Sequence, residues 1–263
     1  ETAEIGTRDL RVTRLGLGAA PLSGWQAAAE TVRRAHDLGI RYFDTAPLYG
    51  RGKSEHHLGR GLAPVPRSQV TLSTKVGRLL DPPDAAGNST VRVAFDFSRD
   101  GVRRSLEESL QRLGLDSVDI ALIHDPDDHY RQAVDEALPA LVELRAQGVV
   151  KAIGAGMNQW EMLARFVCEG EFDCFLLAGR YTLLDQSGLA ELLPLCESAG
   201  ISVILGGPYN SGILSSDLSP GAKYFYEDAP PEVLEHARQL KAVCDRHDVP
   251  LKAAALQFGL AHP

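Results

Sequence analysis

Residues 39–62 read GIRYFDTAPLYGRGKSEHHLGRGL and contain one complete strand, loop and helix. The short run Arg41–Asp44 has the length and the aliphatic and aromatic content of a buried strand. Apolar residues near three- and four-residue spacing predict a helix over Ser54–Gly61. Asp44 closes the strand, and Tyr49 lies in the loop before the helix. The stretch therefore predicts a βα unit with an acid and a phenol at the carboxyl end of its strand.

The same alternation of short apolar runs and amphipathic stretches continues along the chain, which favours parallel βαβ units over separate all-β and all-α parts. The predicted strands are Thr13–Leu17, Arg41–Asp44, Val70–Lys75, Val118–Ile123, Val150–Gly154, Cys174–Leu177 and Ile201–Leu205. The predicted helices are Gln26–Leu38, Ser54–Gly61, Ser98–Leu113, Arg131–Gln147, Gln159–Cys168 and Ser187–Ala199. Glycines suited to a left-handed cap follow four helical runs, at Gly39, Gly114, Gly148 and Gly200. The pattern predicts an α/β fold of the (β/α)₈ TIM-barrel class.

The two ends of the chain depart from a regular barrel pattern. Thr7–Val12 precedes the first barrel strand and predicts part of a small hairpin that closes the lower end of the barrel. After the seventh strand come a Gly- and Pro-rich loop, Gly206–Pro220, and helices near Pro231–His247 and Pro250–Ala261. An eighth strand and helix are missing, although the edges of the first and seventh strands need them. We expect residues 1–263 to form a single barrel domain without its C-terminal βα unit; an open barrel is the alternative.

The composition excludes several classes of partner. The 263 residues carry a net charge of −8, and the 27 Lys and Arg residues are scattered, which argues against nucleic-acid and anionic-membrane partners. No apolar stretch reaches the roughly 18 residues of a membrane span, and ETAEIGTRDLRV lacks the apolar core of a secretory signal. We therefore expect a soluble, cytoplasmic protein, a monomer or small homo-oligomer, that acts on a small molecule.

The four cysteines give no sign of a disulfide framework or a metal site. They are widely spaced, without a CxxC pair and without histidines at zinc-finger spacing. Buried, reduced thiols are the expected state of all four, which are Cys168, Cys174, Cys196 and Cys244.

Chemically active side chains gather where predicted strands end. Asp44 and Tyr49 follow one strand, Lys75 ends VTLSTK, and His124 ends DIALIH. Each has an ordinary alternative as a helix cap, a packed ring, a solvated lysine or a structural histidine. Active sites of such barrels lie at the carboxyl ends of the strands, so four such residues at three successive strand ends favour a shared catalytic site.

The combination suits the interconversion of a carbonyl and an alcohol. A phenol titrates near pH 10 in water, so Tyr49 alone is too weak an acid at neutral pH. An adjacent Lys75 ammonium stabilises the phenolate, and Asp44 pairs with Lys75 and holds it in place. His124 donates a hydrogen bond to the substrate oxygen. None of these side chains donates hydride, so a redox cofactor is required.

These residues carry a resemblance to the aldo-keto reductase superfamily. The stretch 39–62 resembles its signature, and LSTKVG and ALIHDPD resemble its lysine and histidine segments. The similarity extends through Arg14–Pro21, residues 98–119, VVKAIGAG and ISVILGGPYNSGIL. The resemblance implies that Asp44, Tyr49, Lys75 and His124 form the family's catalytic tetrad. It also implies NADP or NAD bound across the barrel mouth, without a Rossmann fold and without metal; Pro21 likewise breaks the GxG string that begins at Gly16.

The resemblance implies further contacts, less closely matched to the family pattern. The expected cofactor-binding residues are Ala19, Asp44, Gly156, Asn158, Gly206, Gly207, Pro208, Asn210 and Gly212. The expected substrate-binding residues are Tyr49, His124 and Trp160. Many family members have Ser-Asn, Gln and an aromatic residue where this chain has Gly156–Asn158, Ala178 and Gly206. The loop Gly207–Leu214 is either a cradle of backbone amides for pyrophosphate or a glycine-rich connector.

A narrower similarity concerns the substrate. GRYTLLDQ, VILGGPYNSGIL, DFSRDGV and LIHDPDDH resemble the branch with L-fucose and D-threo-aldose 1-dehydrogenases and pyridoxal 4-dehydrogenase-like proteins. That resemblance implies oxidation of the anomeric hydroxyl of an aldose to a lactone. Trp160, Tyr130 and Tyr209 are either sugar contacts or packed rings.

Two other functions stay open. A metal-dependent barrel hydrolase would use the cluster HDPDDH, with His124, Asp125, Asp127, Asp128 and His129, but Lys75 and Tyr49 are poor complements to a cation. A regulatory barrel that binds cofactor without significant turnover would share the same tetrad. An acidic, solvated loop is the simpler reading of Asp125–Asp128.

Overall fold

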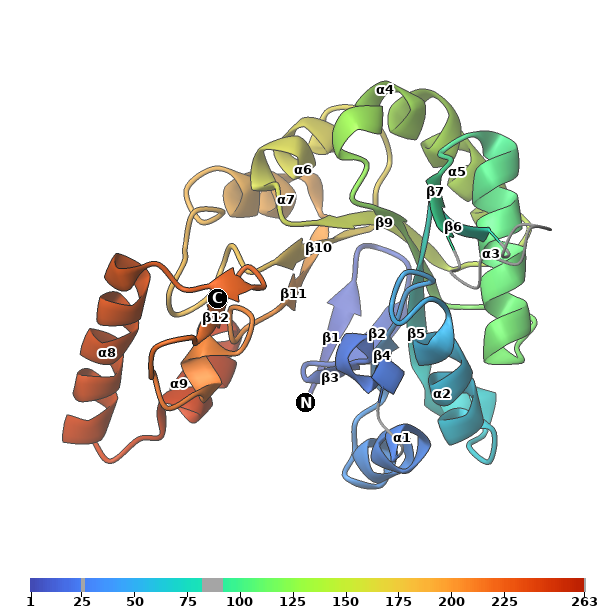
Figure 1. The fold of residues 1–263 in the computed structure, drawn as a ribbon. Helices are drawn as coiled ribbons and strands as arrows, with labels where there is room; N and C mark the ends of the chain where they lie inside the picture. The colour runs from blue at the N-terminus through green and yellow to red at the C-terminus, as the bar shows by residue number, and fades with distance from the viewer. Residues whose placement is uncertain (25–26, 82–91, 263) are drawn as a thin grey trace.

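A curved sheet of seven parallel strands forms the centre of the molecule (Figure 1). The computed structural model describes residues 1–24, 27–81 and 92–262, and all statements below concern these residues. Each strand pairs with the previous strand of this sheet along the chain, the order that successive βαβ crossovers produce. The strands are β3 (Gly16–Gly18), β4 (Tyr42–Asp44), β5 (Thr71–Val76), β8 (Ile120–His124), β9 (Ala152–Met157), β10 (Cys174–Ala178) and β11 (Ser202–Gly206). The predicted parallel barrel architecture is confirmed for these seven strands.

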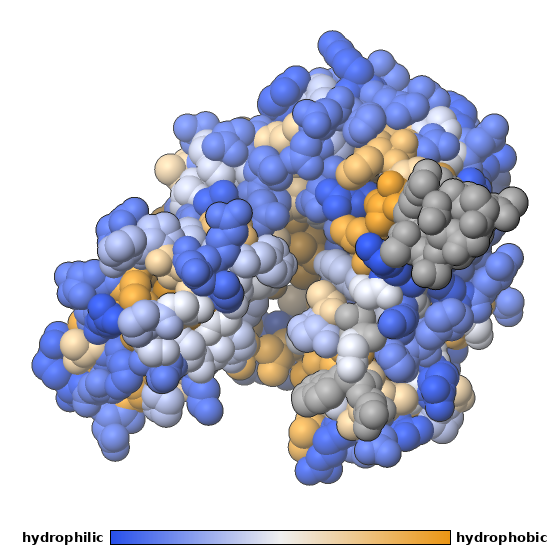
Figure 2. Space-filling view, viewed as in Figure 1, coloured by the Kyte–Doolittle hydropathy of each residue, from blue (hydrophilic) through white to orange (hydrophobic). Residues whose placement is uncertain are grey.

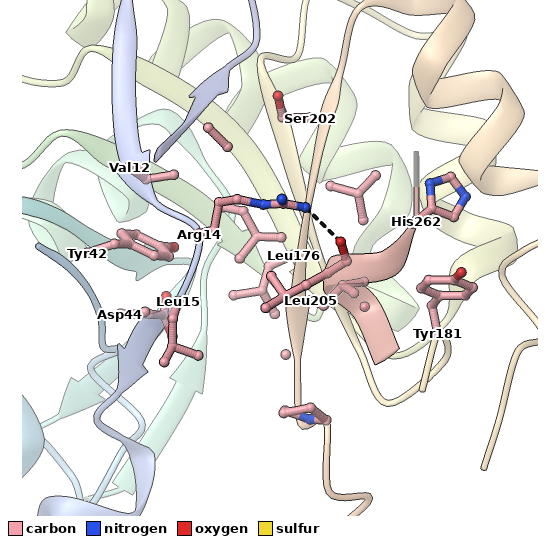
Figure 3. A pocket seen from close by; sticks show the side chains of 18 of the residues that line it. Val12, Arg14, Leu15, Tyr42, Asp44, Leu176, Tyr181, Ser202, Leu205 and His262 are labelled. Atoms are coloured by element: carbon pink, nitrogen blue, oxygen red, sulfur yellow. Dashed lines mark hydrogen bonds between the residues drawn. The ribbon is translucent and has the colours of Figure 1, made fainter. Parts of the chain in front are cut away.

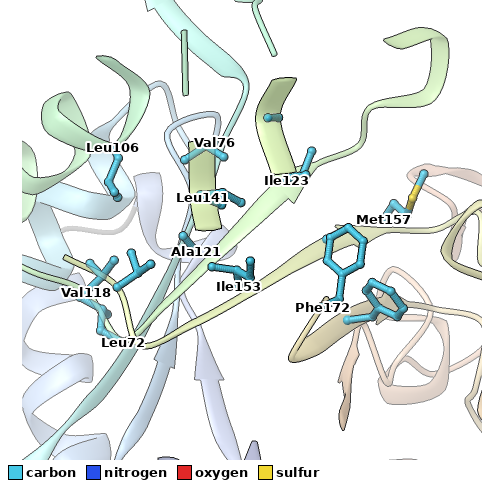
Figure 4. Packing of buried hydrophobic residues seen from close by; sticks show 14 of the residues in the cluster. Leu72, Val76, Leu106, Val118, Ala121, Ile123, Leu141, Ile153, Met157 and Phe172 are labelled. Atoms are coloured by element: carbon cyan, nitrogen blue, oxygen red, sulfur yellow. The ribbon is translucent and has the colours of Figure 1, made fainter. Parts of the chain in front are cut away.

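Helices cover the outer face of the sheet and bury its main core (Figure 4). Alternate residues of β8 show how: Ala121 and Ile123 face the helices, whereas Ile120 and Leu122 face the barrel interior. These helices are α1 (Ala28–Asp37), α2 (Lys53–Leu62), α3 (Arg99–Leu113), α4 (Tyr130–Gln132), α5 (Leu138–Ala146), α6 (Trp160–Val167) and α7 (Leu192–Ala199). Two more helices, α8 (Pro231–Arg246) and α9 (Leu251–Phe258), bury a separate apolar cluster. None of the helices, among the residues described, is long and apolar enough to cross a membrane.

A hairpin of β1 (Thr2–Ile5) and β2 (Leu10–Thr13) fills the lower end of the barrel. Ile5, Leu10 and Val12 pack in one cluster with interior side chains such as Ile120 and Leu176. The expected N-terminal hairpin is therefore confirmed, with Thr7 to Asp9 in its turn. The barrel is plugged at one end and open at the other, where the strands have their carboxyl ends.

The sheet stays open between its two edge strands, β3 and β11. A cavity of about 570 Å³ lies between them, and the space-filling view shows the molecule hollowed at this place (Figure 2). Tyr42 and Asp44 lie on one side of the cavity, and Tyr181 and His262 on the other (Figure 3). Arg14 reaches across, because its Nη2 donates to the carbonyl oxygen of Leu260 at 2.8 Å.

Most predicted helices and strands begin or end a few residues from their observed bounds. The helix predicted over Arg131–Gln147 is present from Tyr130 to Ala146, but a π-helical turn, Ala133–Ala137, lies between α4 and α5. Pro139 explains the change, because proline lacks the N–H that would bond to the previous turn. The helix predicted from Ser187 begins only at Leu192.

The strand predicted over Thr13–Leu17 is also interrupted. β2 ends at Thr13, and β3 begins at Gly16. The Thr13 hydroxyl donates to the Leu15 carbonyl at 2.8 Å and accepts from the Arg41 N–H at 3.0 Å, which favours a turn over a continuous strand.

Two further hairpins follow the carboxyl ends of strands and were not predicted. The first consists of β6 (Arg78–Asp81) and β7 (Arg92–Phe95), and the second of β12 (Lys223–Tyr224) and β13 (Glu227–Asp228). Gly77 begins the first with a φ of +94°, and a Cβ there would lie 2.1 Å from the Phe97 ring. Only glycine fits this turn beside Lys75 and Val76.

The cysteines only partly match expectation. All four are free thiols, and Cys174 and Cys196 are buried. Cys244 is half-buried and Cys168 is exposed, so burial was wrong for these two. Cys168 follows α6 directly, where the helix ends at the surface.

Candidate active site at the strand ends

Lys75 and Asp44 form a buried ion pair on neighbouring strands. The Lys75 Nζ donates to both Asp44 carboxylate oxygens, at 3.0 and 2.8 Å, and to the Thr45 carbonyl at 2.9 Å. The lysine side chain is only 1% exposed. Burial opposes its charge, but Asp44 and Tyr49 together raise the pKa of Lys75 above its ordinary value. The lysine is therefore a fixed ammonium at neutral pH.

A hydrogen-bond chain that the sequence did not predict supports Asp44 from within the barrel. Ser73, opposite Asp44 in the β4–β5 register, donates to Asp44 Oδ1 at 2.7 Å. The Tyr42 hydroxyl lies 2.9 Å from the Ser73 oxygen, and it is the donor because the Ser73 proton is already directed at Asp44. Ser73, itself held by Tyr42, thus helps to fix the carboxylate that holds Lys75.

Tyr49 lies over this ion pair. The Lys75 Nζ is 4.7 Å from the centroid of its ring, and the His124 ring meets it edge-on at 5.9 Å. Burial raises the pKa of Tyr49 above 10, and the positive charge of Lys75 opposes the shift. The structure therefore brings together the four residues predicted from separate strand ends.

His124 is the last residue of β8 and is almost fully buried. Burial, then the positive charges of Lys75 and Arg78, lower the pKa of His124 well below 6.5. The ring is neutral at pH 7, so one of its nitrogens carries a proton and the other accepts. The buried Nδ1 atom of His124 has no hydrogen-bond partner within the described part of the chain.

The segments expected to hold a cofactor lie at the same end of the barrel. Asn158 follows β9, and its Nδ2 donates to the Ala178 carbonyl at 2.8 Å, which leaves the side-chain oxygen directed elsewhere. A Cβ at Gly156 in β9 would lie 3.6 Å from Lys75 Cε, in ordinary van der Waals contact, so this glycine lies directly beside the lysine. Ala19 is fully buried, and its N–H donates to the Asp44 carbonyl at 2.8 Å.

The loop after β11 consists of hydrogen-bonded turns. Gly207, Asn210, Ser211 and Gly212 all have positive φ angles. The N–H groups of Asn210 and Gly212 donate to the carbonyls of Gly207 and Tyr209, at 2.9 and 3.0 Å, so they are already bonded within the loop. Asn210 is buried, its Nδ2 donates to the Gly179 carbonyl at 3.1 Å, and its Oδ1 has no partner among the residues described. Gly206, Gly207 and Pro208 line the adjoining cavity.

The aromatic residues considered for a sugar occupy different surroundings. Trp160 begins α6 and packs partly against the main core. Tyr130 stacks on Phe166 at 5.1 Å and donates to Glu169 at 2.7 Å, so its packing role is evident. Tyr209 packs against the cluster beneath α8 and α9.

The acidic stretch after β8 does not gather into a metal site. Across residues 1–24, 27–81 and 92–262, no group of three or more His, Cys, Asp and Glu residues is placed to hold a cation. Asp127 and Asp128 lie in a short 3₁₀ turn, and His129 stacks on Phe95 at 5.6 Å.

Comparison with known proteins identifies the fold and the family. The model of the aldo/keto reductase family matches residues 14–263. The chain belongs to this family. The aldo/keto reductase is similar to a pyridoxal 4-dehydrogenase from Microbacterium luteolum, with 40% identity over 100% of this chain and 86% of the relative. It is 42% identical to a D-threo-aldose 1-dehydrogenase from Pseudomonas sp, over 95% of this chain and 82% of the relative.

A solved structure agrees with the assignment. The holo form of an aldo-keto reductase from Bacillus halodurans superposes with a TM-score of 0.83 and 28% identity, covering 100% of this chain and 83% of that one. The present aldo/keto reductase is thus an oxidoreductase of carbonyls and alcohols that uses a nicotinamide nucleotide.

Proposed function

We propose that this aldo/keto reductase is an NAD(P)-dependent aldose 1-dehydrogenase, which oxidises the anomeric hydroxyl of an L-fucose or D-threo-aldose type of sugar to a lactone. The proposal is supported by the 42% identity to a D-threo-aldose 1-dehydrogenase. One observation carries the chemistry: a buried Lys75 ammonium lies 4.7 Å from the Tyr49 ring centroid, beside a neutral His124.

Each member of the tetrad has a separate role in this proposal. Tyr49 removes the proton from the anomeric hydroxyl, and in the reverse direction it returns that proton. Lys75 stabilises the phenolate, and Asp44 keeps Lys75 charged and in position. His124 donates a hydrogen bond to the substrate oxygen and orients the sugar. The bound nicotinamide supplies the hydride acceptor.

We assign the cofactor to the mouth of the barrel on the same grounds. The proposed binding residues are Ala19, Asp44, Gly156, Asn158, Gly206, Gly207, Pro208, Asn210 and Gly212. The side-chain oxygen of Asn158, which accepts no hydrogen bond from the described residues, suits a carboxamide, and the loop that contains Asn210 and Gly212 is proposed to border the pyrophosphate. Trp160 is proposed to border the sugar.

The test is the initial rate of NADH or NADPH formation with L-fucose, D-arabinose, L-galactose or pyridoxal and each oxidised cofactor. We expect one sugar to be oxidised, and Tyr49→Phe to lose on the order of 10³-fold in kcat. Tyr130→Phe is the matched control, since it removes a phenol that bonds to Glu169 on the surface, and it should retain the activity.

Other results would change the assignment. Oxidation of pyridoxal alone would retain the tetrad chemistry and replace the sugar. Saturable binding of dinucleotide, measured by quenching of protein fluorescence, without turnover of any of the four compounds would favour a regulatory barrel.

A further inference from the structure

A second carboxylate stands at the mouth of the barrel, next to the proposed catalytic histidine. Asp125 Oδ2 lies 3.5 Å from His124 Nε2, which is longer than a usual hydrogen bond. The Asp125 side chain is 23% exposed, so it is neither solvated nor sealed in the core. The tetrad as assigned above makes no use of it.

Arg78 holds this carboxylate from the neighbouring strand end. Its Nη2 lies 2.8 Å from Asp125 Oδ2, and its Nε donates to the His124 carbonyl at 3.3 Å. The guanidinium also lies 5.1 Å from the Phe95 ring centroid, so the β6–β7 hairpin fixes its position. Arg78 therefore positions both Asp125 and the backbone of His124.

The backbone at Asp125 adopts a conformation that a non-glycine residue rarely occupies. Its φ is +40°, and its N–H donates to the Gly156 carbonyl at 3.0 Å. Left-handed residues of this kind cost free energy and persist where surrounding contacts enforce them, often at functional sites. Asp128, in the same loop, is exposed, whereas Asp125 is turned back toward His124.

We propose that Asp125 is a specificity-determining residue, whose carboxylate accepts a hydrogen bond from the hydroxyl on the carbon next to the reacting carbon. The inference rests on the proposed function and names the substrate feature that the site selects. His124 Nε2 and Asp125 Oδ2 are 3.5 Å apart, which suits two neighbouring oxygens of one substrate, each at about 2.8 Å from its partner.

The chemistry of the two groups matches an α-hydroxy carbonyl or its cyclic hemiacetal. A carboxylate is an acceptor only, so it selects a hydroxyl donor and disfavours a carboxylate at the same place. The hydrogen bond is charge-assisted, and a substrate without the hydroxyl leaves the half-buried acceptor without that contact. Sites built around such a bond reject the deoxy analogue far more strongly than apolar pockets reject a missing methylene.

The experiment compares D-arabinose with 2-deoxy-D-ribose, which differ only in the hydroxyl at C2. We expect the wild-type enzyme to prefer D-arabinose, and Asp125→Ala to reduce the ratio of the two kcat/KM values by about ten- to a hundredfold. Turnover of the deoxy sugar should not decrease, because it makes no hydrogen bond to Asp125 in the wild type. Asp125→Asn retains an acceptor oxygen and should give an intermediate ratio, whereas Asp128→Ala should match the wild type.

The inference is overturned if Asp125→Ala keeps the wild-type ratio, or if it slows both sugars equally, as a purely structural role would. If the wild-type enzyme oxidises neither of these sugars, nor L-fucose or L-galactose, the aldose assignment fails separately. The same comparison is then made by reducing glycolaldehyde and acetaldehyde with NADH or NADPH, since they too differ by one α-hydroxyl. A ratio unaffected by Asp125→Ala in that pair would overturn the role of Asp125 itself.

Discussion

Titratable side chains lie both at the lower end and at the mouth of the barrel, but they differ in how completely their polar atoms are paired. At the lower end, Asp173 accepts from the Ile153 N–H at 2.9 Å and pairs with Arg8 and Arg145, each at 2.6 Å. At the mouth, His124 has a ring nitrogen without a described partner, and Asp125 adopts a left-handed backbone.

The lower end repeats its arrangement two strands away, at β8. Asp119, just before β8, accepts from the Leu72 N–H at 2.9 Å and pairs with Arg67 at 2.6 Å and Lys151 at 2.8 Å. Both aspartates thus satisfy their oxygens with a backbone donor and two cations. Charged groups at the amino ends of these strands thus stabilise the barrel, whereas the roles proposed for His124 and Asp125 at the carboxyl ends are in substrate binding.

The largest expected effect is on the rate, at the mouth. Lys75→Met removes the charge that stabilises the Tyr49 phenolate, so we expect kcat to fall by about 10³-fold. Because burial already raises the pKa of Tyr49, the remaining alcohol oxidation should reach its maximum at a higher pH than in the wild type. A pH series of initial rates measures both, and a profile in the original position would contradict the role of Lys75.

The next effect is on stability, at the lower end. Asp173→Asn leaves Arg145, which is 12% exposed, with only the exposed carboxylate of Glu171 at 3.6 Å, and should reduce the free energy of unfolding by about 3 kcal/mol. Urea denaturation measures the loss, and kcat per folded molecule should stay within about twofold. A large loss of kcat with an unchanged free energy of unfolding would mean that Asp173 serves catalysis rather than stability, which would contradict the distinction between the two ends.

A pH effect on stability comes from the mouth. His124 in the folded protein has a pKa well below 6.5, whereas in the unfolded chain it takes up a proton near 6.5. Unfolding therefore binds a proton between these two values, and stability falls with decreasing pH by at most about 1.4 kcal/mol per pH unit. Urea midpoints at several pH values should show a shallower decrease for His124→Gln, and His56→Gln, at an exposed position, should leave the slope as it is.

The smallest effect tests the lower end at its surface. Lys151 is 63% exposed, so Lys151→Ala should reduce stability by only about 0.5 kcal/mol although it removes a 2.8 Å ion pair with Asp119. Arg67→Ala should reduce it more, because Arg67 is half as exposed and bonds the same carboxylate. Equal losses for the two variants would mean that exposure does not set their contributions.

The four proposed catalytic residues could be predicted from the sequence because each lies at or shortly after the end of a strand that the local sequence reveals. Asp44, Lys75 and His124 each lie within one residue of a strand end, which is a local property of the chain. Parallel pairing then brings neighbouring strand ends together without further information.

Other parts of the site depend on contacts between distant residues, which no local pattern reveals. The bond from Tyr42 to Ser73 requires the register of β4 and β5, and in the sequence both residues have the character of strand interior. Arg78 reaches Asp125 only because Gly77 turns the chain into a hairpin. Pro139, by contrast, is visible in the sequence and could have indicated the π-helical turn.

The N-terminal hairpin imposes an order on folding during synthesis. The Gly6 N–H donates to the Ser202 hydroxyl at 2.8 Å, and Arg8 pairs with Asp173, so segments made early bind partners 196 and 165 residues further along. Contacts over such separations form slowly, because a long loop must close first. The hairpin can complete these contacts only after β10 and β11 have been synthesised.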